Sequence, residues 1–330
     1  MRTKMFWVAR VWLAFSFTSS AEGLNYDPLA VQFAAAPKIV DLTVHDATRN
    51  RDLPIRVYLP TNPAPVPVIL FSHGLGGNRE NSQYLGEHWA ARGYVCVFLQ
   101  HPGSDDSVWK NTPGGKRMQA MNSAASLDNF LLRVKDVPVV LDQLERWNKQ
   151  TNHALAGRMD LKKVGMSGHS FGAVTTQAVS GQSTMQGDQR FTDPRITAAI
   201  AFSPSKPKAG SAAKAFGNVK IPWLLMTGTK DTAPIGNTSV ADRLAVYPNL
   251  KGAAKYEVVL HDAEHSAFTD RPLPGEKVPR NPNHHRVILA LSTAFWDANL
   301  KGDAAARAWL EGAGPRSVME TEDNWQWAAH

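Results

Sequence analysis

The stretch VGMSGHSFGAVTT, residues 164–176, joins a β-prone run to a run of small, helix-compatible residues. Between the two lies the pentapeptide Gly168-His169-Ser170-Phe171-Gly172. Glycine makes up about 7% of average protein sequence, so a serine between two glycines at this spacing often arises by chance. The pattern gains meaning only where a strand precedes it, a helix follows it, and partners for the serine come later in a fixed order.

Apolar runs of strand length alternate with longer amphipathic segments along most of the chain, which is typical of βαβ units and a parallel sheet. Two early runs, residues 38–44 and 53–60, flank a turn-rich segment and predict an antiparallel hairpin at the sheet edge. Later runs are more continuously apolar, as strands covered by helices on both faces are. They are VPVILFSHG (66–74), YVCVFLQHP (94–102), KVGMSGHS (163–170), ITAAIAFSP (196–204), IPWLLMTGT (221–229) and YEVVLHDAEH (256–265). We therefore expect an α/β fold with a mostly parallel central sheet of about eight strands and helices on both faces.

Four segments between these runs predict helices. In residues 81–93, Asn81 or Ser82 supplies a cap and Gly93 a stop. In the longest segment, residues 126–148, Pro138 predicts a kink or a break into two helices. The other two are residues 171–181, directly after Ser170, and residues 284–302, which would close the fold.

The composition is that of a soluble globular protein, with 43% hydrophobic and 20% charged residues among 330. No internal repeat or linker divides the chain, so we expect one domain over residues 22–330, with its core at about 38–300. The formal net charge of +7 comes without a clustered Lys/Arg run, which argues against a nucleic-acid partner. Cys96 has no second cysteine to pair with and lies in an apolar run, so we expect a small buried hydrophobe.

Residues 1–21 predict a signal peptide and therefore a periplasmic or secreted protein. Basic residues Arg2 and Lys4 precede an apolar run from Val11 to Phe17, and small residues follow, with Ser19 and Ala21 placed as for cleavage. Cleavage would remove three basic residues and no acid. The run is too short to span a bilayer. The alternative is an N-terminal helix on the protein surface.

Ser170 meets the first two conditions for a nucleophile. The run 163–170 supplies a strand before it and residues 171–181 supply a helix after it. At such a turn Gly168 and Gly172 make room where a Cβ would clash with neighbouring backbone. The serine hydroxyl then faces the N-terminus of the following helix, where free N–H groups favour developing negative charge.

A serine nucleophile needs a histidine base, and the imidazole needs a carboxylate that fixes its tautomer. In this fold the chain order is serine, acid, histidine. Asp231 follows the apolar run that ends near residue 229, and His265 ends the next one. The sequence therefore predicts Ser170, Asp231 and His265 as catalytic residues.

Other acids and histidines are weaker candidates for these roles. Neighbours on one loop rarely curl back to bridge to the ring, which argues against the two acids closest to His265. The remaining histidines lie inside the serine turn, at a strand edge or at a helix start. These alternatives are Asp262, Glu264, His169, His261, His284 and His285.

Backbone N–H groups that hold an oxyanion are expected on two segments. One is the N–H of Phe171, the residue after the nucleophile. The other lies in the glycine-rich stretch FSHGLGGN, residues 71–78, with Leu75 as the donor.

The segment from His101 to Ala124 has weak periodicity and leaves the carboxyl end of a strand, where α/β sheets bind ligands. We expect a small lid over about residues 103–125, with a plain surface loop as the alternative. Trp109, Met118 and Met121 are candidates for an acyl pocket, with simple packing as their alternative role. No cluster has the spacing of zinc ligands, and Asp105-Asp106 is read as a solvated pair, so we expect neither metal nor cofactor.

The glycine motifs carry a family resemblance. Residues 68–105, VILFSHGLGGNRENSQYLGEHWAARGYVCVFLQHPGSD, together with GHSFGA, resemble the α/β-hydrolase family. The likeness is to the branch of platelet-activating-factor acetylhydrolases and bacterial dienelactone-hydrolase-like esterases. The segment TGTKDTAPIG is similar to the acid-bearing segment of its bacterial members. The resemblance covers about residues 38–300 and implies the same five site residues. Dienelactone hydrolases use cysteine as nucleophile, so the serine here favours ordinary esters.

These expectations converge on a serine carboxylesterase that acts on a small-molecule or lipid-like ester. Two alternatives stay open: a peptidase or amidase with the same catalytic residues, and a catalytically inactive hydrolase fold used for binding.

Overall fold

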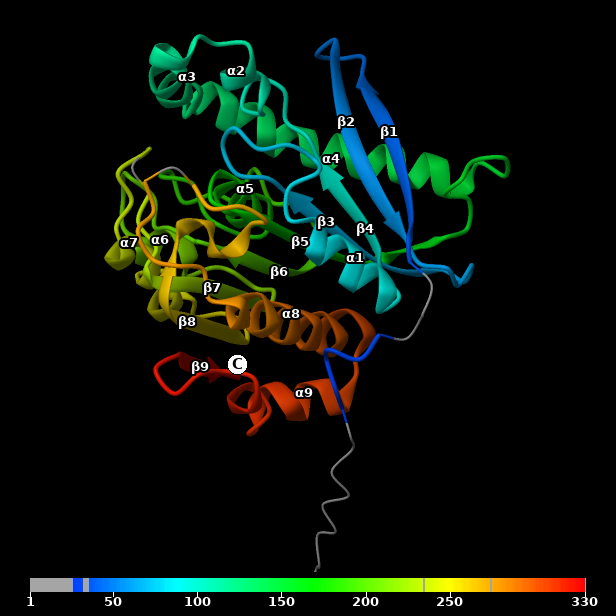
Figure 1. The fold of residues 1–330 in the computed structure, drawn as a ribbon. Coiled ribbons are helices and arrows are strands. Elements are labelled where there is room, and N and C mark those ends of the chain that lie inside the picture. Colours follow the sequence, from blue (N-terminus) through cyan, green and yellow to red (C-terminus); the bar gives the residue numbers. More distant parts are fainter. Residues whose placement is uncertain (1–25, 32–35, 234, 274, 330) are drawn as a thin grey trace, which may run out of the picture.

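A computed structural model describes residues 26–31, 36–233, 235–273 and 275–329 (Figure 1). The predicted signal peptide, residues 1–21, lies outside the described residues. The strands are β1 Lys38–Asp46, β2 Arg51–Leu59, β3 Val66–Ser72, β4 Val95–Leu99, β5 Met159–His169, β6 Ile196–Phe202, β7 Trp223–Lys230, β8 Lys255–Glu264 and β9 Asn324–Ala328.

All of these strands belong to one sheet in the order β1-β2-β4-β3-β5-β6-β7-β8-β9. Strands β4, β3, β5, β6, β7 and β8 are parallel, while β1, β2 and β9 pair antiparallel with their neighbours. The predicted edge hairpin is therefore confirmed, and so is the α/β-hydrolase fold class. Because the parallel strands run the same way, the residues that follow β3, β5, β7 and β8 lie together at the carboxyl ends of the strands.

Strand β9 was not expected from the sequence. It lies at the opposite sheet edge from the hairpin, beneath α8 in Figure 1, and pairs with β8 from Val259↔Asn324 to Lys255↔Ala328. Trp325 stacks on Tyr256 of β8 with ring centroids 6.1 Å apart, so the C-terminal tryptophan packs on the body of the protein. Its residues, NWQWA, alternate polar and apolar side chains as a strand does, but a run of only five residues is a weak signal.

Helices cover both faces of the sheet. Figure 1 shows α1 and α8 on one face and α4 and α5 on the other. The helices are α1 Gln83–Ala91, α2 Ser107–Lys110, α3 Arg117–Ala124, α4 Leu127–Lys149, α5 Phe171–Val179, α6 Ala212–Phe216, α7 Val240–Leu244, α8 Pro282–Trp296 and α9 Ala304–Glu311. Shorter helical turns are η1 Gly114–Lys116, η2 Tyr247–Asn249, η3 His265–Phe268, η4 Asp297–Lys301 and η5 Pro315–Ser317.

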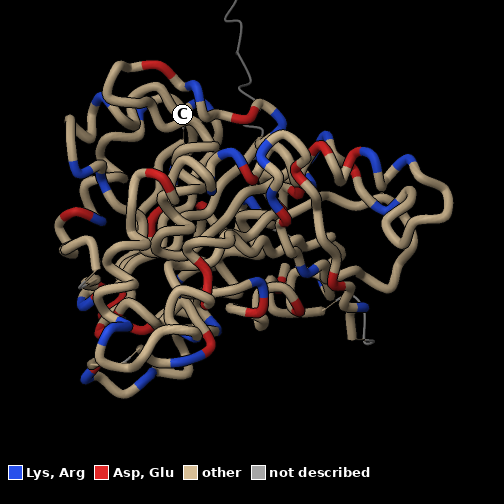
Figure 2. The backbone as a smooth tube through the Cα atoms, turned by 90° about the horizontal axis from the view of Figure 1, so that it is seen from above, with Lys and Arg blue, Asp and Glu red and all other residues tan. Residues whose placement is uncertain are grey.

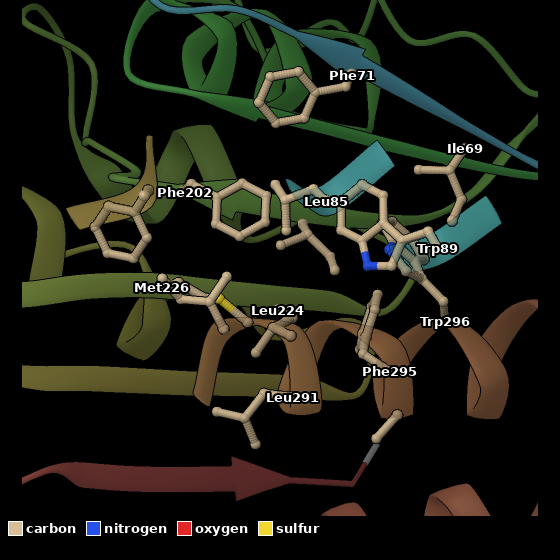
Figure 3. Packing of buried hydrophobic residues seen from close by; sticks show 14 of the residues in the cluster. Ile69, Phe71, Leu85, Trp89, Phe202, Leu224, Met226, Leu291, Phe295 and Trp296 are labelled. Carbon is tan, nitrogen blue, oxygen red and sulfur yellow. The ribbon is translucent and has the colours of Figure 1, made fainter. Parts of the chain in front are cut away.

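The core between the sheet and the pair α1 and α8 is aromatic (Figure 3). Trp89 of α1 meets Trp296 of α8 edge to face, with ring centroids 5.9 Å apart. Phe71 and Phe202, from β3 and β6, are fully or almost fully buried beside them. Fully burying such side chains contributes about 1.5–3 kcal/mol each, so this layer fixes the strands that carry the site.

Helix α4 is continuous from Leu127 to Lys149, so of the two outcomes predicted at Pro138, a kink or a break, the break into two helices is wrong. Residues around the proline are held against the sheet, with Val137 and Val140 fully buried. The carbonyl of Pro138 accepts a hydrogen bond from Arg195 Nη2 at 3.3 Å. Packing of the flanking turns therefore outweighs the backbone hydrogen bond that proline cannot make.

The positions of Lys and Arg and those of Asp and Glu are interspersed along the backbone in Figure 2. Arg195, for example, contacts Asp142, Glu145 and Asp193 at 2.6–2.9 Å. Among the described helices, none has the length and apolar character needed to cross a bilayer.

Candidate active site

Ser170 occupies the turn between β5 and α5. Its φ of 57° and ψ of −114° lie in a region that residues other than glycine rarely adopt, which stores backbone strain at this position. The turn is held by a hydrogen bond from the Ser170 N–H to the Phe202 carbonyl at 3.0 Å. The serine side chain is thereby raised above the carboxyl edge of the sheet, where it stays partly exposed.

Gly168 and Gly172 make the turn possible. A Cβ on Gly168 would lie 2.5 Å from the Gly172 carbonyl oxygen, and a Cβ on Gly172 would overlap the carbonyl of Ser72. Both obstacles are backbone and cannot rotate away. The two glycines are therefore required by the close approach of β3, β5 and α5.

Gly172→Ala is expected to destabilise the fold by about 3 kcal/mol or more, because overpacking against backbone costs at least as much as overpacking in a core. Gly115→Ala is the control, since a Cβ at Gly115 meets nothing within 4 Å. Thermal unfolding of both variants measures the difference. A Gly172→Ala protein that melts with the wild type would contradict the steric account.

The structure brings Ser170, His265 and Asp231 together from three strand ends. Ser170 Oγ lies 2.8 Å from His265 Nε2, and His265 Nδ1 lies 2.6 Å from Asp231 Oδ1. Thr227 Oγ1 donates to Asp231 Oδ2 at 2.9 Å, which fixes the carboxylate plane. In this arrangement the Nδ1 proton is held by the acid, and Nε2 is left as the acceptor that faces the serine.

Asp231 is fully buried and ionised. Burial would raise its pKa, but the neighbouring His265 and Arg243 bring the pKa down to about 2. Arg243 Nε lies 2.9 Å from Asp231 Oδ1, and its Nη1 donates to the Ser203 carbonyl at 2.7 Å. Arg243 was not expected from the sequence, because a single arginine on a short polar helix gives no local signal.

The two expected oxyanion donors lie on segments next to the serine, since a Cβ on Gly74 would lie 3.5 Å from Ser170 Cβ and Phe171 follows the serine directly. Leu75 follows β3 and Phe171 begins α5, and both are partly exposed. Neither N–H donates a hydrogen bond to any residue that the structure describes. The loop itself is fixed, because the Gly76 N–H donates to the Ser104 carbonyl at 2.9 Å and the Gly77 N–H to the Gly74 carbonyl at 3.1 Å.

The alternative acids contact other groups. Asp262 Oδ1 lies 2.9 Å from Lys230 Nζ, and Glu264 accepts from the N–H groups of Lys277 and Val278. Neither makes a hydrogen bond to His265, whose Nδ1 is already used by Asp231.

The alternative histidines do not reach the serine. His169 Nε2 bonds to the His265 carbonyl at 2.9 Å, and burial lowers its pKa to about 3, so it stays neutral. His284 Nε2 bonds to the His261 carbonyl at 3.0 Å, and His285 stacks on Tyr84. The His169 ring packs against the His265 ring, with ring centroids 4.7 Å apart.

Of the three expected pocket residues, the structure brings two to the loop of residues 73–78 that carries Leu75, which we call the oxyanion loop after its expected role. Trp109 Nε1 donates to the Gly76 carbonyl at 2.7 Å, and a Cβ on Gly76 would lie 2.5 Å from Met121 Cε. Met118 is 58% exposed and makes no comparable contact. Helices α2 and α3 thus dock against this loop, while their behaviour as a lid stays a prediction.

A second serine, histidine and aspartate constellation lies beneath the first. His101 Nε2 is 2.9 Å from Ser72 Oγ, and His101 Nδ1 is 2.9 Å from Asp136 Oδ2. All three side chains are completely buried, and Asp136 also pairs with Arg49 and Arg51. No substrate reaches this set, so it ties β3, β4 and α4 together and is structural. Among the described residues no group of histidines, cysteines and acids is placed to hold a metal ion.

The fold, with a partly exposed serine hydroxyl hydrogen-bonded to a buried imidazole and through it to a buried carboxylate, defines a serine hydrolase of the α/β-hydrolase type. The family model of X-Pro dipeptidyl-peptidase (S15 family) matches residues 50–187, which include both the loop at Leu75 and the turn at Ser170. The match ends before Asp231 and His265 and spans less than half of the chain. No curated protein matches the chain. The likeness to the platelet-activating-factor acetylhydrolase branch stays a prediction.

Proposed function

We propose that the protein is a serine esterase that hydrolyses small or lipid-like carboxylic esters through an acyl-enzyme intermediate. The observation that supports the proposal is the hydrogen-bond chain from Asp231 through His265 to the partly exposed hydroxyl of Ser170. A serine hydroxyl becomes nucleophilic when an oriented imidazole can accept its proton.

In this mechanism Ser170 Oγ attacks the ester carbonyl while His265 Nε2 takes the hydroxyl proton. Asp231 stabilises the imidazolium, and the N–H groups of Leu75 and Phe171 hold the oxyanion. The carbon–oxygen bond to the alcohol then breaks, and the alcohol leaves with the proton from His265. Water repeats the sequence on the acyl-enzyme and releases the acid.

Ester cleavage is favoured over peptide cleavage by the groups around the site. A dipeptidyl peptidase must recognise the free ammonium group of its substrate, which calls for an available carboxylate. The acids at and after the ends of β4 and β8 already accept hydrogen bonds or form ion pairs within the described part of the chain, so they are not available to an ammonium group. They are Asp105, Asp106, Asp262, Glu264, Asp270 and Glu276. An amine is also a poorer leaving group than an alcohol.

Peptidase activity is the second candidate, because the matching family model is that of a peptidase. That match includes the nucleophile turn but not the acid or the base. An X-Pro anilide is the substrate that this candidate favours.

Matched substrates separate the two functions. A p-nitrophenyl ester is expected to be cleaved with a kcat/KM at least ~100-fold above that of the p-nitroanilide with the same acyl group, because the anilide depends more strongly on proton donation. The release of nitrophenol and nitroaniline is followed in parallel, with Gly-Pro p-nitroanilide as a third substrate. Faster cleavage of the anilides would reverse the order of the two candidates.

A further inference from the structure

A fully buried arginine lies under the oxyanion loop. Arg133 extends from α4 toward the end of β3 and is completely shielded from solvent. Its Nη1 donates to the His73 carbonyl at 2.7 Å, and its Nε donates to Ser104 Oγ at 2.8 Å. Nη2 reaches the carbonyls of Gly74 and Ser104, each at 3.4 Å.

The partners of this arginine are neutral. Among the described ion pairs none involves Arg133, and Asp136, one turn further along α4, contacts Arg49, Arg51 and His101 instead. Burial lowers the pKa of Arg133 to about 9, which keeps the guanidinium cationic near pH 7. A buried cation without a carboxylate partner is costly, so a gain elsewhere is needed to offset it.

Other titratable groups packed against Arg133 do not neutralise it. Burial lowers the pKa of His101 to about 4 and that of His73 well below its usual value, so both rings are uncharged at neutral pH. Asp105, on the neighbouring loop, accepts from Gln100 Nε2 at 2.7 Å and from Ser107 Oγ at 2.5 Å. A positive charge therefore persists beside the loop.

The bonds made by Arg133 set the direction of the oxyanion donor. In a trans peptide the carbonyl and the following N–H point in opposite directions. The Gly74 carbonyl is turned inward by Arg133 Nη2, the Gly77 N–H and the ring of His73. The N–H of Leu75, on the same peptide plane, is consequently turned outward, away from the guanidinium.

Arg133 also supports the second donor. Its guanidinium carbon lies 4.4 Å from the centre of the Phe171 ring, a cation–π contact. Phe171 contributes the other N–H. One side chain thus contacts both segments that carry the oxyanion donors, and it does so from the side of the loop that solvent does not reach.

We propose that Arg133 is the positioning residue of the oxyanion hole, orienting the Leu75 peptide and the Phe171 segment and adding a fixed positive charge behind them. This inference rests on the proposed function, since an oxyanion forms only in acyl transfer. Its effect is confined to the tetrahedral state, because the neutral ester carbonyl gains little from the charge.

Two substitutions test the role. Arg133→Met is expected to lower kcat for p-nitrophenyl butyrate by roughly 10²–10³-fold with KM within a few-fold of wild type, the size of effect that follows loss of one oxyanion donor. Affinity for phenylboronic acid, which forms a tetrahedral adduct with the serine, should fall in parallel. Arg133→Lys keeps the charge but cannot bridge all of the carbonyls, so we expect an intermediate kcat.

Arg92→Met is the matched control. Arg92 is a buried arginine that pairs with Asp297 at 2.6 Å, away from the site, so its loss lowers the melting temperature while kcat per folded molecule stays near wild type. Active-site titration with a fluorophosphonate gives the folded fraction of each variant. If Arg133→Met does not fold, the test uses Arg133→Lys instead. Its affinity for the boronate is then expected to be lower than that of Arg92→Met.

The outcomes are distinguishable. Wild-type kcat and boronate affinity in the Arg133 variants, or a loss no larger than in Arg92→Met, would overturn the inference while leaving the esterase intact. A wild-type protein that neither turns over esters nor binds the boronate would overturn the proposed function and the inference with it.

Discussion

Ser170→Ala is expected to lower kcat for ester hydrolysis by roughly 10⁴- to 10⁶-fold, with the larger loss if no other group replaces the nucleophile. His265 Nε2 would then face a methyl group in place of the hydroxyl at 2.8 Å. KM should change little, because the serine hydroxyl makes little contribution to binding the intact ester. The measurement is the hydrolysis of p-nitrophenyl butyrate under single-turnover and steady-state conditions.

Ser180→Ala is the control for this experiment. Ser180 caps the opposite end of α5, is buried, and its Oγ has no hydrogen-bond partner among the described residues. We expect activity within two-fold of wild type. Retention of activity within a few-fold in Ser170→Ala would remove the nucleophile from the mechanism.

Asp231→Asn is expected to lower kcat by roughly 10⁴-fold at neutral pH, because the amide no longer selects the imidazole tautomer that leaves Nε2 free to accept a proton. The change is also unfavourable locally, since Asp231 Oδ1 accepts from His265 Nδ1 at 2.6 Å and pairs with Arg243 Nε at 2.9 Å. An amide nitrogen there would face two donors.

Asp262→Asn tests whether Asp231 or Asp262 is the acid that orients His265. Asp262 lies close to His265 in sequence but pairs with Lys230 at 2.9 Å, so we expect near-wild-type kcat. The pH–rate profiles of both variants with p-nitrophenyl butyrate complete the comparison. A large loss in Asp262→Asn, with Asp231→Asn still active, would show that the acid has been misassigned.

Much of the fold was predictable because its signals are local. The six parallel strands are continuous apolar runs, and the hairpin is a pair of alternating strands around a turn. The requirements of the nucleophile turn are also visible in adjacent residues. Only glycine fits at positions 168 and 172, because a Cβ there would clash with the backbone of β3 and α5. These features need no knowledge of distant contacts.

The supporting arginines were not predictable in the same way. Arg133 contacts a residue 60 positions away in the chain and Arg243 one 22 positions away, so no short motif marks them. One signal was present: Arg133 lies on the buried stripe of α4, four residues before Val137, where a charged residue is unexpected. A charge on the apolar face of a helix is therefore worth reading as a buried functional group.

The second set of serine, histidine and aspartate differs from the first in its accessibility. Ser72, His101 and Asp136 have hydrogen bonds much like those of the set at Ser170, but here the serine is completely buried and out of reach of any substrate. Hydrogen-bond distances thus identify a poised serine only when the serine is also accessible. Ser170 meets both conditions.

The central claim is that Ser170 is the nucleophile, and labelling with a fluorophosphonate followed by peptide mapping tests it most directly. The account predicts one adduct per chain, on the peptide that contains Ser170 and not on the one that contains Ser72, with parallel loss of esterase activity. The rate of labelling should collapse in His265→Gln. An adduct on another residue, or full esterase activity in a protein labelled at Ser170, would contradict the claim.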